Sequence, residues 1–306
     1  MLRPSLAWPG LADRAEIAYW DSLPGSEETL IDRIGAAPAV LNIRSSSRFT
    51  EGVFAALPEL RILSVWGTGT DHVDLAAAAR HAVTVTNTPG VSAVSIAEHT
   101  LALLLAVARQ IPPVDAATRR GEWAKGQSVQ LRGKTCGVIG LGAIGREFAR
   151  LAAALGMRVL GWTMHARQIP GVEMVEPDEL YRASDVISLH LRLSSETENF
   201  LGQRQFALLK RTAIVLNTAR GGLVEEAALV DALAGGRLAG AGLDVFAREP
   251  LPAGHPLTRL PNVVLTPHCA GITPEALEAG LRMAVENIWC FAEERPEHVV
   301  SARSAG

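Results

Sequence analysis

A glycine-rich turn between a short apolar run and an amphipathic run constrains this chain more than any other feature of its sequence. The apolar run covers residues 136–139, and glycines follow at positions 140, 142 and 145. Apolar residues then recur at helical spacing, at Ile144, Phe148, Leu151 and Leu155. This order predicts a strand, a tight turn and a helix.

Each glycine has a separate use in a dinucleotide-binding unit. The first permits the turn, the second lets backbone N–H groups approach a pyrophosphate at the helix N-terminus, and the third allows close packing of helix on strand. A glycine triplet alone can be a bare turn, but a second apolar run at residues 158–162 completes the required order. We therefore predict a dinucleotide site, with contacts from Gly140, Gly142, Ala143, Ile144 and Gly145.

Composition restricts the class of partner. The 306 residues are enough for two domains, and 48% hydrophobic with 20% charged residues is typical of a soluble globular protein. A formal charge of -3 gives no basic surface for nucleic acid or membrane, so we expect small-molecule partners. Cys136, Cys269 and Cys290 form no metal-ligand or disulfide pattern, and the N-terminus has no apolar run typical of a signal peptide, which together indicate the cytoplasm.

Short apolar runs alternate with spacers over the first third of the chain, at residues 16–20, 39–43, 62–66 and 83–86. This alternation predicts a parallel α/β sheet. Polar loops follow two of the runs, at residues 44–47 and 67–71. Ligands bind beyond the carboxyl ends of such strands, where turn N–H groups can hold a carboxylate; plain turns with a solvated serine cluster are the alternative.

Apolar residues recur at spacings of three to five over residues 92–109, which predicts a helix. The helix is apolar nearly all round and therefore needs partners on several faces. We expect it to connect two domains and to form a subunit contact, with a less periodic arm over residues 111–130. Six strands and their crossover helices then predict a second doubly wound sheet, the later strands lying at residues 186–189, 213–217, 238–243 and 263–266. A last helix at residues 274–293 is long enough to pack back on the first domain.

Three polar residues follow successive strand ends of the second sheet: Arg220, Glu249 and His268. An arginine can bind the carboxylate of a 2-oxo acid bidentately and polarise its carbonyl. A histidine can exchange the proton that accompanies a hydride, and a carboxylate can orient it. Each residue alone has another explanation, as a surface ion pair, a loop carboxylate or a turn histidine, but together they favour a hydride-transfer site.

The chain resembles the D-isomer-specific 2-hydroxyacid dehydrogenase family from about residue 40 to residue 293. The segments that carry the resemblance are Gly67–Asp74, Asn87–Gly90, Ser95–His99, Gly137–Gly145, Asn217–Gly221, Gly242–Phe246 and Leu265–His268. The expected α/β fold has two doubly wound domains: a discontinuous, flavodoxin-like substrate-binding domain at residues 1–91 and 275–306, and a Rossmann NAD(P)-binding domain at residues 92–274. The family also implies a homodimer, formed through residues 92–130.

The resemblance implies roles for individual residues. Arg220 would bind and polarise the substrate, His268 would be the general acid/base and Glu249 its partner, while Asp244 is similar to the family's acceptor for the nicotinamide carboxamide. The substrate carboxylate is expected at the backbone of Thr68 and Gly69, with Ser45 nearby. Arg220 and His268 are also expected to contact the substrate. The further expected cofactor contacts are His190, Leu191, Thr218 and Ala219.

One position departs from the family pattern. NAD-dependent members usually carry an acid at the end of the second strand, where it bonds the adenosine ribose, and the matching residue here is Thr163. Without the acid a 2′-phosphate meets no repulsion, and His165 and Arg167 can donate to it. This favours NADP(H) within an NAD(P) cofactor class, although a loop arginine is often merely solvated.

We therefore predict an NAD(P)-dependent oxidoreductase that interconverts a small 2-oxo acid, such as glyoxylate or hydroxypyruvate, with its D-2-hydroxy acid. Phosphite oxidation is an alternative, because that branch resembles the same Arg, Glu and His set. Formate oxidation is less favoured, because that branch departs from the Glu–His pairing. A dinucleotide-sensing binding protein of the same fold is the alternative outside the enzymes.

Overall fold

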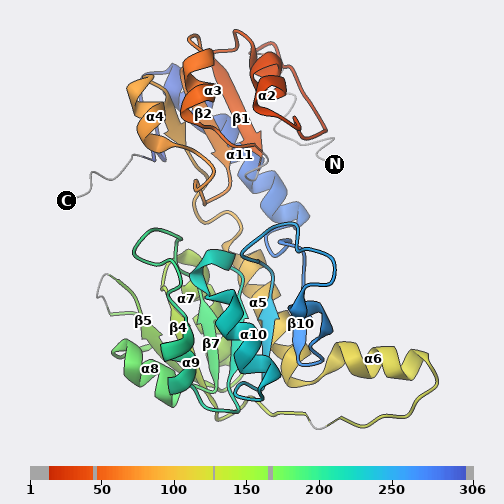
Figure 1. Ribbon diagram of the computed structural model, residues 1–306. Coiled ribbons are helices and arrows are strands. Elements are labelled where there is room, and N and C mark those ends of the chain that lie inside the picture. Colours follow the sequence, from red (N-terminus) through yellow and green to blue (C-terminus); the bar gives the residue numbers. More distant parts are fainter. Residues whose placement is uncertain (1–13, 44–46, 127, 165–167, 301–306) are drawn as a thin grey trace. The chain divides into compact units, whose positions relative to one another are not determined.

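The structure is a computed structural model that describes residues 14–43, 47–126, 128–164 and 168–300 (Figure 1). The chain divides into two compact units, the first made of Met1–Ser92 with Ile272–Gly306 and the second of Ala93–Gly271. Each unit is built on its own sheet, and each sheet is parallel throughout. Ser45, His165 and Arg167, which the sequence predicts at the site, lie outside the described residues.

The sheet of the first unit contains β1 (Ala39–Ile43), β2 (Ile62–Trp66) and β3 (Thr84–Thr86), in that order. The helices between and before them are α2 (Glu27–Ile34), α3 (Glu51–Ala56) and α4 (Leu75–Arg80). Each of these helices begins after a side chain that caps it, Ser26, Thr50 or Asp74. Such caps satisfy N–H groups that the first turn leaves without partners.

The central strand β2 is covered on both faces. Leu63 and Val65 pack in one apolar cluster with residues of α2, α3 and α4. Ser64 points the other way and donates from Oγ to the carbonyl oxygen of Ala284 at 2.8 Å, in the long helix α11 (Pro274–Ala292). A Cβ on Gly280 would overlap the indole of Trp66, so α11 lies directly against this face. The last helix therefore packs on the first sheet, as the sequence predicts.

The second unit has a seven-stranded sheet in the order β10-β9-β8-β7-β4-β5-β6 (Figure 1). Its strands are β4 (Thr135–Ile139), β5 (Arg158–Trp162), β6 (Glu173–Met174), β7 (Val186–Leu189), β8 (Ile214–Asn217), β9 (Gly240–Leu243) and β10 (Val263–Leu265). The chain runs outward from β4 first in one direction and then in the other. This is the Rossmann order, with the switch point between β4 and β7, where ligands bind in such sheets. The predicted α/β class is confirmed.

Helices cover both faces of this sheet. One apolar cluster joins alternate strand residues to α5 (Ala93–Ala108) and α7 (Ala143–Ala154), and the other joins the intervening residues to α8 (Pro177–Ala183), α9 (Gln203–Leu208) and α10 (Glu226–Ala234). Two 3-10 turns, η1 (Gly221–Leu223) and η2 (Pro256–Arg259), lie in the loops after β8 and β9. The apolar α5 packs against α7, β8 and β9, which explains its lack of a polar face.

Three elements differ from the sequence-based prediction. Residues 16–20 form no strand; they are exposed or half-buried and pair with no other strand in the described ranges. The arm after α5 begins with an additional helix, α6 (Ile111–Arg119), because its prolines occupy the first turn, where a missing N–H leaves no bond unmade. The two-residue β6 makes the sheet one strand wider than predicted.

No single helix in the described ranges is long and apolar enough to cross a membrane. Taken together, α5 and α6 satisfy such a test of length and composition, but only as a pair bent by 62°.

Candidate functional site

The glycine turn after β4 has the geometry that a pyrophosphate requires. Gly140 has a φ of 92°, in the left-handed region, and a Cβ there would press on the backbone of His190. A Cβ on Gly145 would overlap the carbonyl oxygen of Gly140, so α7 packs closely on the turn. At Gly142, the N-cap of α7, no side chain caps the helix and a Cβ would meet nothing within 4 Å. The open N-terminus of α7 therefore fits the phosphates of a dinucleotide.

Thr163 lies beside this turn. It follows β5, and the carbonyl oxygen of the preceding Trp162 accepts from the Gly140 N–H at 2.8 Å. Trp162 stacks on Phe200 with ring centroids 5.2 Å apart, which fixes the end of the strand. Thr163 is half-buried and carries no charge, so no carboxylate faces a ribose from this position.

His190 closes the other side of the turn, at the end of β7. Its N–H donates to the Ile139 carbonyl at 2.7 Å, and its Nε2 lies 2.8 Å from the Ser188 hydroxyl. Burial lowers the pKa of His190 to about 3, so the ring is neutral at physiological pH. His190 and its buried neighbour Leu191 thus form an uncharged wall at the switch point.

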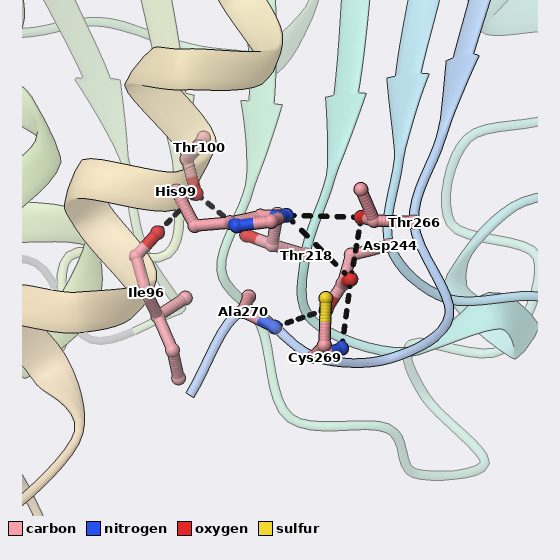
Figure 2. Close-up of polar contacts among 8 residues, drawn as sticks. All are labelled: Ile96, His99, Thr100, Thr218, Asp244, Thr266, Cys269 and Ala270. Carbon is pink, nitrogen blue, oxygen red and sulfur yellow. Dashed lines mark hydrogen bonds and ion pairs between the residues drawn. The ribbon is translucent and has the colours of Figure 1, made fainter. Parts of the chain in front are cut away.

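Asp244, just beyond β9, organises the loop after β10 (Figure 2). Its buried carboxylate accepts from the Thr266 hydroxyl at 2.6 Å and from the N–H groups of Cys269 and Ala270, both at 2.9 Å. Its own carbonyl oxygen accepts from the His268 N–H at 2.7 Å. Four hydrogen bonds therefore hold residues 266–270 around one aspartate, and the three that go to its carboxylate are charge-assisted, which makes them the stronger ones.

His99, on α5, completes the network from the helix side. Its Nε2 lies 2.9 Å from Oγ1 of Thr266 and 3.6 Å from the Asp244 carboxylate. Because the Thr266 hydroxyl donates its proton to Asp244, it can only accept from His99, which places the His99 proton on Nε2. Figure 2 shows His99 and Thr266 side by side, next to the carboxylate. The next residue of α5, Thr100, bonds the Thr218 hydroxyl at 2.8 Å.

One group of possible metal ligands lies in this network. His99, Asp244 and Cys269 offer ligand atoms within 4.8 Å of one another. The three donors to Asp244 and the bond from His99 to Thr266 already engage two of these side chains. We therefore describe the cluster as a hydrogen-bond network and assign no metal to it.

The network holds His268 in an unusual backbone conformation. The φ of His268 is 51°, which costs an L-residue about 1–2 kcal/mol and here is stabilised by the bonds to Asp244. The ring Nδ1 lies 2.7 Å from Oε2 of Glu249. A carboxylate can only accept, so Nδ1 carries a proton and Nε2 is the nitrogen that can exchange one with a ligand.

Glu249 is held from two directions. Its Oε1 accepts from the Phe246 N–H at 3.1 Å, while Oε2 faces His268. Burial alone would raise the pKa of the Glu249 carboxyl, but the bonds from His268 and Phe246, together with the charges of His268 and Arg220, bring that pKa below its ordinary value. Glu249 is therefore ionised wherever the protein is folded near neutral pH.

Arg220 lies in a turn fixed by Asn217, the buried last residue of β8. The Asn217 amide donates to the Arg220 carbonyl at 2.8 Å and accepts from the Ala219 N–H at 3.0 Å. The Arg220 guanidinium also donates to the Ala219 carbonyl at 2.8 Å. This turn starts at the end of β8, next to β9 in the sheet, so Arg220, Glu249, His268 and Asp244 follow three adjacent strands.

Thr68 and Gly69 belong to the first unit, where they follow β2. The loop is braced by the end of β3: Gly67 donates to the Thr88 hydroxyl at 2.8 Å, and the Asn87 amide donates to the Thr68 carbonyl at 2.8 Å. In the described part of the chain, the N–H groups of Thr68 and Gly69 donate to no protein acceptor. Two such N–H groups in a rigid turn suit a carboxylate.

Sequence reasoning placed the acids and bases of the site but not the residues that hold them. His99 and Thr266 were visible only as a polar break in an apolar helix and as a strand-end threonine. Asn217 was visible as a polar side chain ending an apolar run, which is a usable signal, since a buried amide at a strand end must find partners.

Comparisons with known proteins agree with this geometry. The family model described as D-isomer specific 2-hydroxyacid dehydrogenase, NAD binding domain, matches residues 101–270. The glyoxylate reductase of Aeropyrum pernix is 38% identical over 301 residues, which cover 94% of this chain and 90% of that protein. The D-3-phosphoglycerate dehydrogenase of Archaeoglobus fulgidus is 42% identical over 279 residues, and this chain spans about half of it, 52%.

A solved structure of an acyclic imino acid reductase in complex with NADPH and D-Arg is similar in fold, with a TM-score of 0.91 and 31% identity over 97% of this chain and 96% of that one. The family match includes the glycine turn and the three strand ends, because it spans residues 101–270. The chain therefore belongs to the D-isomer specific 2-hydroxyacid dehydrogenase family.

Proposed function

We propose that this protein reduces small 2-oxo acids, of the glyoxylate or hydroxypyruvate type, to D-2-hydroxy acids with NAD(P)H. The observation that carries the proposal is the His268–Glu249 pair at 2.7 Å, with Arg220 close enough for its charge to lower the pKa of Glu249. All three follow adjacent strands, β8, β9 and β10, of the sheet that also carries the glycine turn. The names of relatives, glyoxylate reductase and glycerate dehydrogenase, support this substrate class.

In this mechanism the bound cofactor supplies the hydride, and the chain supplies binding, orientation and a proton. Arg220 holds the substrate carboxylate and polarises the adjacent carbonyl. His268 carries a proton on Nε2 and gives it to the developing alkoxide oxygen, while Glu249 keeps Nδ1 protonated and the ring oriented. We propose residues 1–91 and 275–306 as the substrate-binding domain, with Thr68, Gly69 and Ser45 as its expected contacts to the substrate, and residues 92–274 as the cofactor domain.

For the cofactor itself, we propose that the open N-terminus of α7 holds the pyrophosphate at Gly142, Ala143 and Ile144. Asp244 would accept from the nicotinamide carboxamide, and the remaining contacts would come from His190, Leu191, Thr218 and Ala219. NADP(H) is favoured over NAD(H) because Thr163 presents no negative charge to a 2′-phosphate, with His165 and Arg167 as expected donors. The NADPH in the similar solved structure supports this preference.

The experiment is a spectrophotometric screen. Glyoxylate and hydroxypyruvate are tested with NADH and NADPH, and phosphite and formate are tested with the oxidised cofactors NAD+ and NADP+. We expect reduction of the 2-oxo acids, faster with NADPH, and a loss of at least roughly a hundredfold in kcat/KM for Arg220→Ala and His268→Ala. Thr163→Asp should shift the preference towards NADH. Turnover of phosphite alone would instead identify the protein as a phosphite-oxidising enzyme. Cofactor binding without any turnover would favour a dinucleotide-sensing binding protein.

We further propose a homodimer formed through residues 92–130 and a cytoplasmic location. This segment exposes several large apolar side chains, among them Ile111 at 55% and Trp123 at 85%. An exposed apolar set of this kind is typical of an interaction surface. The three cysteines carry free thiols, as is usual in a reducing compartment. Light scattering on the wild type and on Trp123→Ser would test the dimer, and a monomeric wild type would disprove it.

A further inference from the structure

The loop that carries Glu249 contains no helix or strand between Asp244 and His255. A side chain on such a loop is positioned only as well as the loop itself is held. Within the loop, Glu249 bonds the N–H of Phe246, whose side chain is buried in the apolar core, but the exposed residues 247–250 that follow have no such burial. The anchor must therefore come from a neighbouring element.

Glu226, the first residue of α10, provides such an anchor. Its Oε2 accepts from the Ala247 N–H at 3.1 Å, and its Oε1 lies 3.2 Å from Nε2 of His255. The side chains of His255 and Glu226 are only 18% and 22% exposed, so water competes less for the contact between them than for the exposed bond to Ala247. A single carboxylate on a helix thus holds both ends of the segment 247–255.

The proton position on His255 follows from its other bond. Its Nδ1 accepts from the Leu257 N–H at 3.3 Å, so a neutral ring carries its proton on Nε2, the nitrogen that lies 3.2 Å from the Glu226 carboxylate. The attraction to Glu226 therefore does not require a second proton on the ring. Leu257 lies in η2, which joins His255 to the next ordered element.

The anchored end of the loop also touches the turn of Arg220. A Cβ on Gly221 would overlap the carbonyl group of Phe246, so these two backbones are in direct contact. Phe246 is the residue whose N–H bonds Glu249, and the next residue, Ala247, is the one that Glu226 holds. Displacement of Ala247 would move Phe246, and with it the spacing of Glu249 from both His268 and Arg220.

We propose that Glu226 and His255, the Glu226–His255 clasp, are positioning residues that hold the Glu249 loop so that Glu249 meets His268. The proposal rests on the proposed function, since it assigns Glu249 to the acid/base pair. It extends the site to two residues that touch neither substrate nor cofactor. Their effect passes entirely through the backbone of residues 246–257.

The test uses variants matched in shape. His255→Gln keeps an amide N–H near the place of Nε2 and can still donate to Glu226, whereas His255→Asn keeps only the acceptor for Leu257 and loses the clasp. Glu226→Ala removes it from the other side. The control is Glu225→Gln, since Glu225 is the adjacent carboxylate and accepts from the Gln203 N–H at 3.0 Å, away from this loop.

We expect His255→Asn and Glu226→Ala each to lower kcat/KM for the 2-oxo acid by about tenfold to a hundredfold, the size expected when a catalytic group is misplaced by about 1 Å. Cofactor affinity should not change, His255→Gln should retain most of the activity, and the double variant should be no worse than Glu226→Ala. Equal losses in His255→Gln and His255→Asn, or additive losses in the double variant, would overturn the proposal.

A second measurement does not depend on turnover. The pKa of the Glu249 carboxyl, followed by carbon NMR and assigned with Glu249→Gln, should rise towards its ordinary value in His255→Asn and Glu226→Ala, because the bonds from His268 and Phe246 loosen. It should stay low in His255→Gln and Glu225→Gln. An unchanged pKa in all variants would refute the clasp even in an inactive protein, while an inactive wild type with the expected pKa pattern would refute only the proposed function.

Discussion

Replacement of Thr266 by valine removes one hydroxyl and keeps the shape of the side chain. That hydroxyl donates to the Asp244 carboxylate at 2.6 Å and accepts from His99 at 2.9 Å. The Asp244 side chain is 1% exposed, so water cannot replace the lost donor. Asp244 keeps the N–H groups of Cys269 and Ala270, and His99 loses its acceptor.

The expected loss follows from these contacts. A hydrogen bond to a buried charged group contributes about 1.5–3 kcal/mol. His99 offsets part of this, because its Nε2 lies 3.6 Å from the carboxylate and can turn its proton to Asp244 once Thr266 no longer accepts it. We therefore expect the second unit to lose about 2 kcal/mol of unfolding free energy, which for a unit of this size lowers the Tm by about 4–8 °C.

The assay is thermal unfolding with and without NADPH, because the transition that the cofactor raises belongs to the unit that binds it. Thr266→Ser is the control: it keeps the hydroxyl and should unfold close to the wild type. In a double-mutant cycle with His99→Leu, the effect of Thr266→Val should grow, because the offset from His99 is gone. Equal melting of Thr266→Val and Thr266→Ser would refute the assignment of this hydroxyl to Asp244.

Three further predictions concern the same sheet edge. Gly221→Ala should lower kcat/KM by at least roughly a hundredfold and leave cofactor affinity unchanged, because the added Cβ would overlap the Phe246 carbonyl and separate Arg220 from Glu249. Steady-state kinetics and cofactor titration check this. Gly145→Ala should lower both cofactor affinity and stability, because its Cβ would overlap the Gly140 carbonyl; an unaltered dissociation constant would contradict it. The wild type should be more stable than Glu249→Gln above pH about 4.3, and the difference should vanish as pH falls through the lowered pKa of Glu249. Urea unfolding at neutral and acid pH tests this. The effect should be modest because the Glu249 side chain is 34% exposed.

Hydrophobic runs and glycines were enough to predict most of the second unit. Runs such as residues 136–139 and 186–189 are buried strands because a parallel sheet covered on both faces exposes neither side of a strand; Ser188, the polar residue among them, is buried and bonds His190. The same reasoning failed for residues 16–20, where the run is apolar enough for a strand but pairs with no other in the described ranges. Burial depends on neighbours that a single segment does not reveal.

The proximity of three polar side chains at one sheet edge was predictable for a different reason. Arg220, Glu249 and His268 each follow a strand of one parallel sheet, and the carboxyl ends of such strands meet at one edge. The structure brings Glu249 and His268 into direct contact, and Arg220 within range of their charges.

The supporting bonds could not be read in the same way, because most of their donors are backbone N–H groups. Glu226 holds the N–H of Ala247, Glu249 holds that of Phe246, and Asp244 holds those of Cys269 and Ala270. Every residue except proline has such a donor, so the partner leaves no mark in the sequence. Only the acceptor is visible, as an acid in or beside a loop, and that acid looks the same whether it faces water, a substrate or the backbone. The three acids Glu226, Asp244 and Glu249 differ only in which backbone the fold presents to them, which is why the sequence did not distinguish Glu226 from an ordinary surface acid.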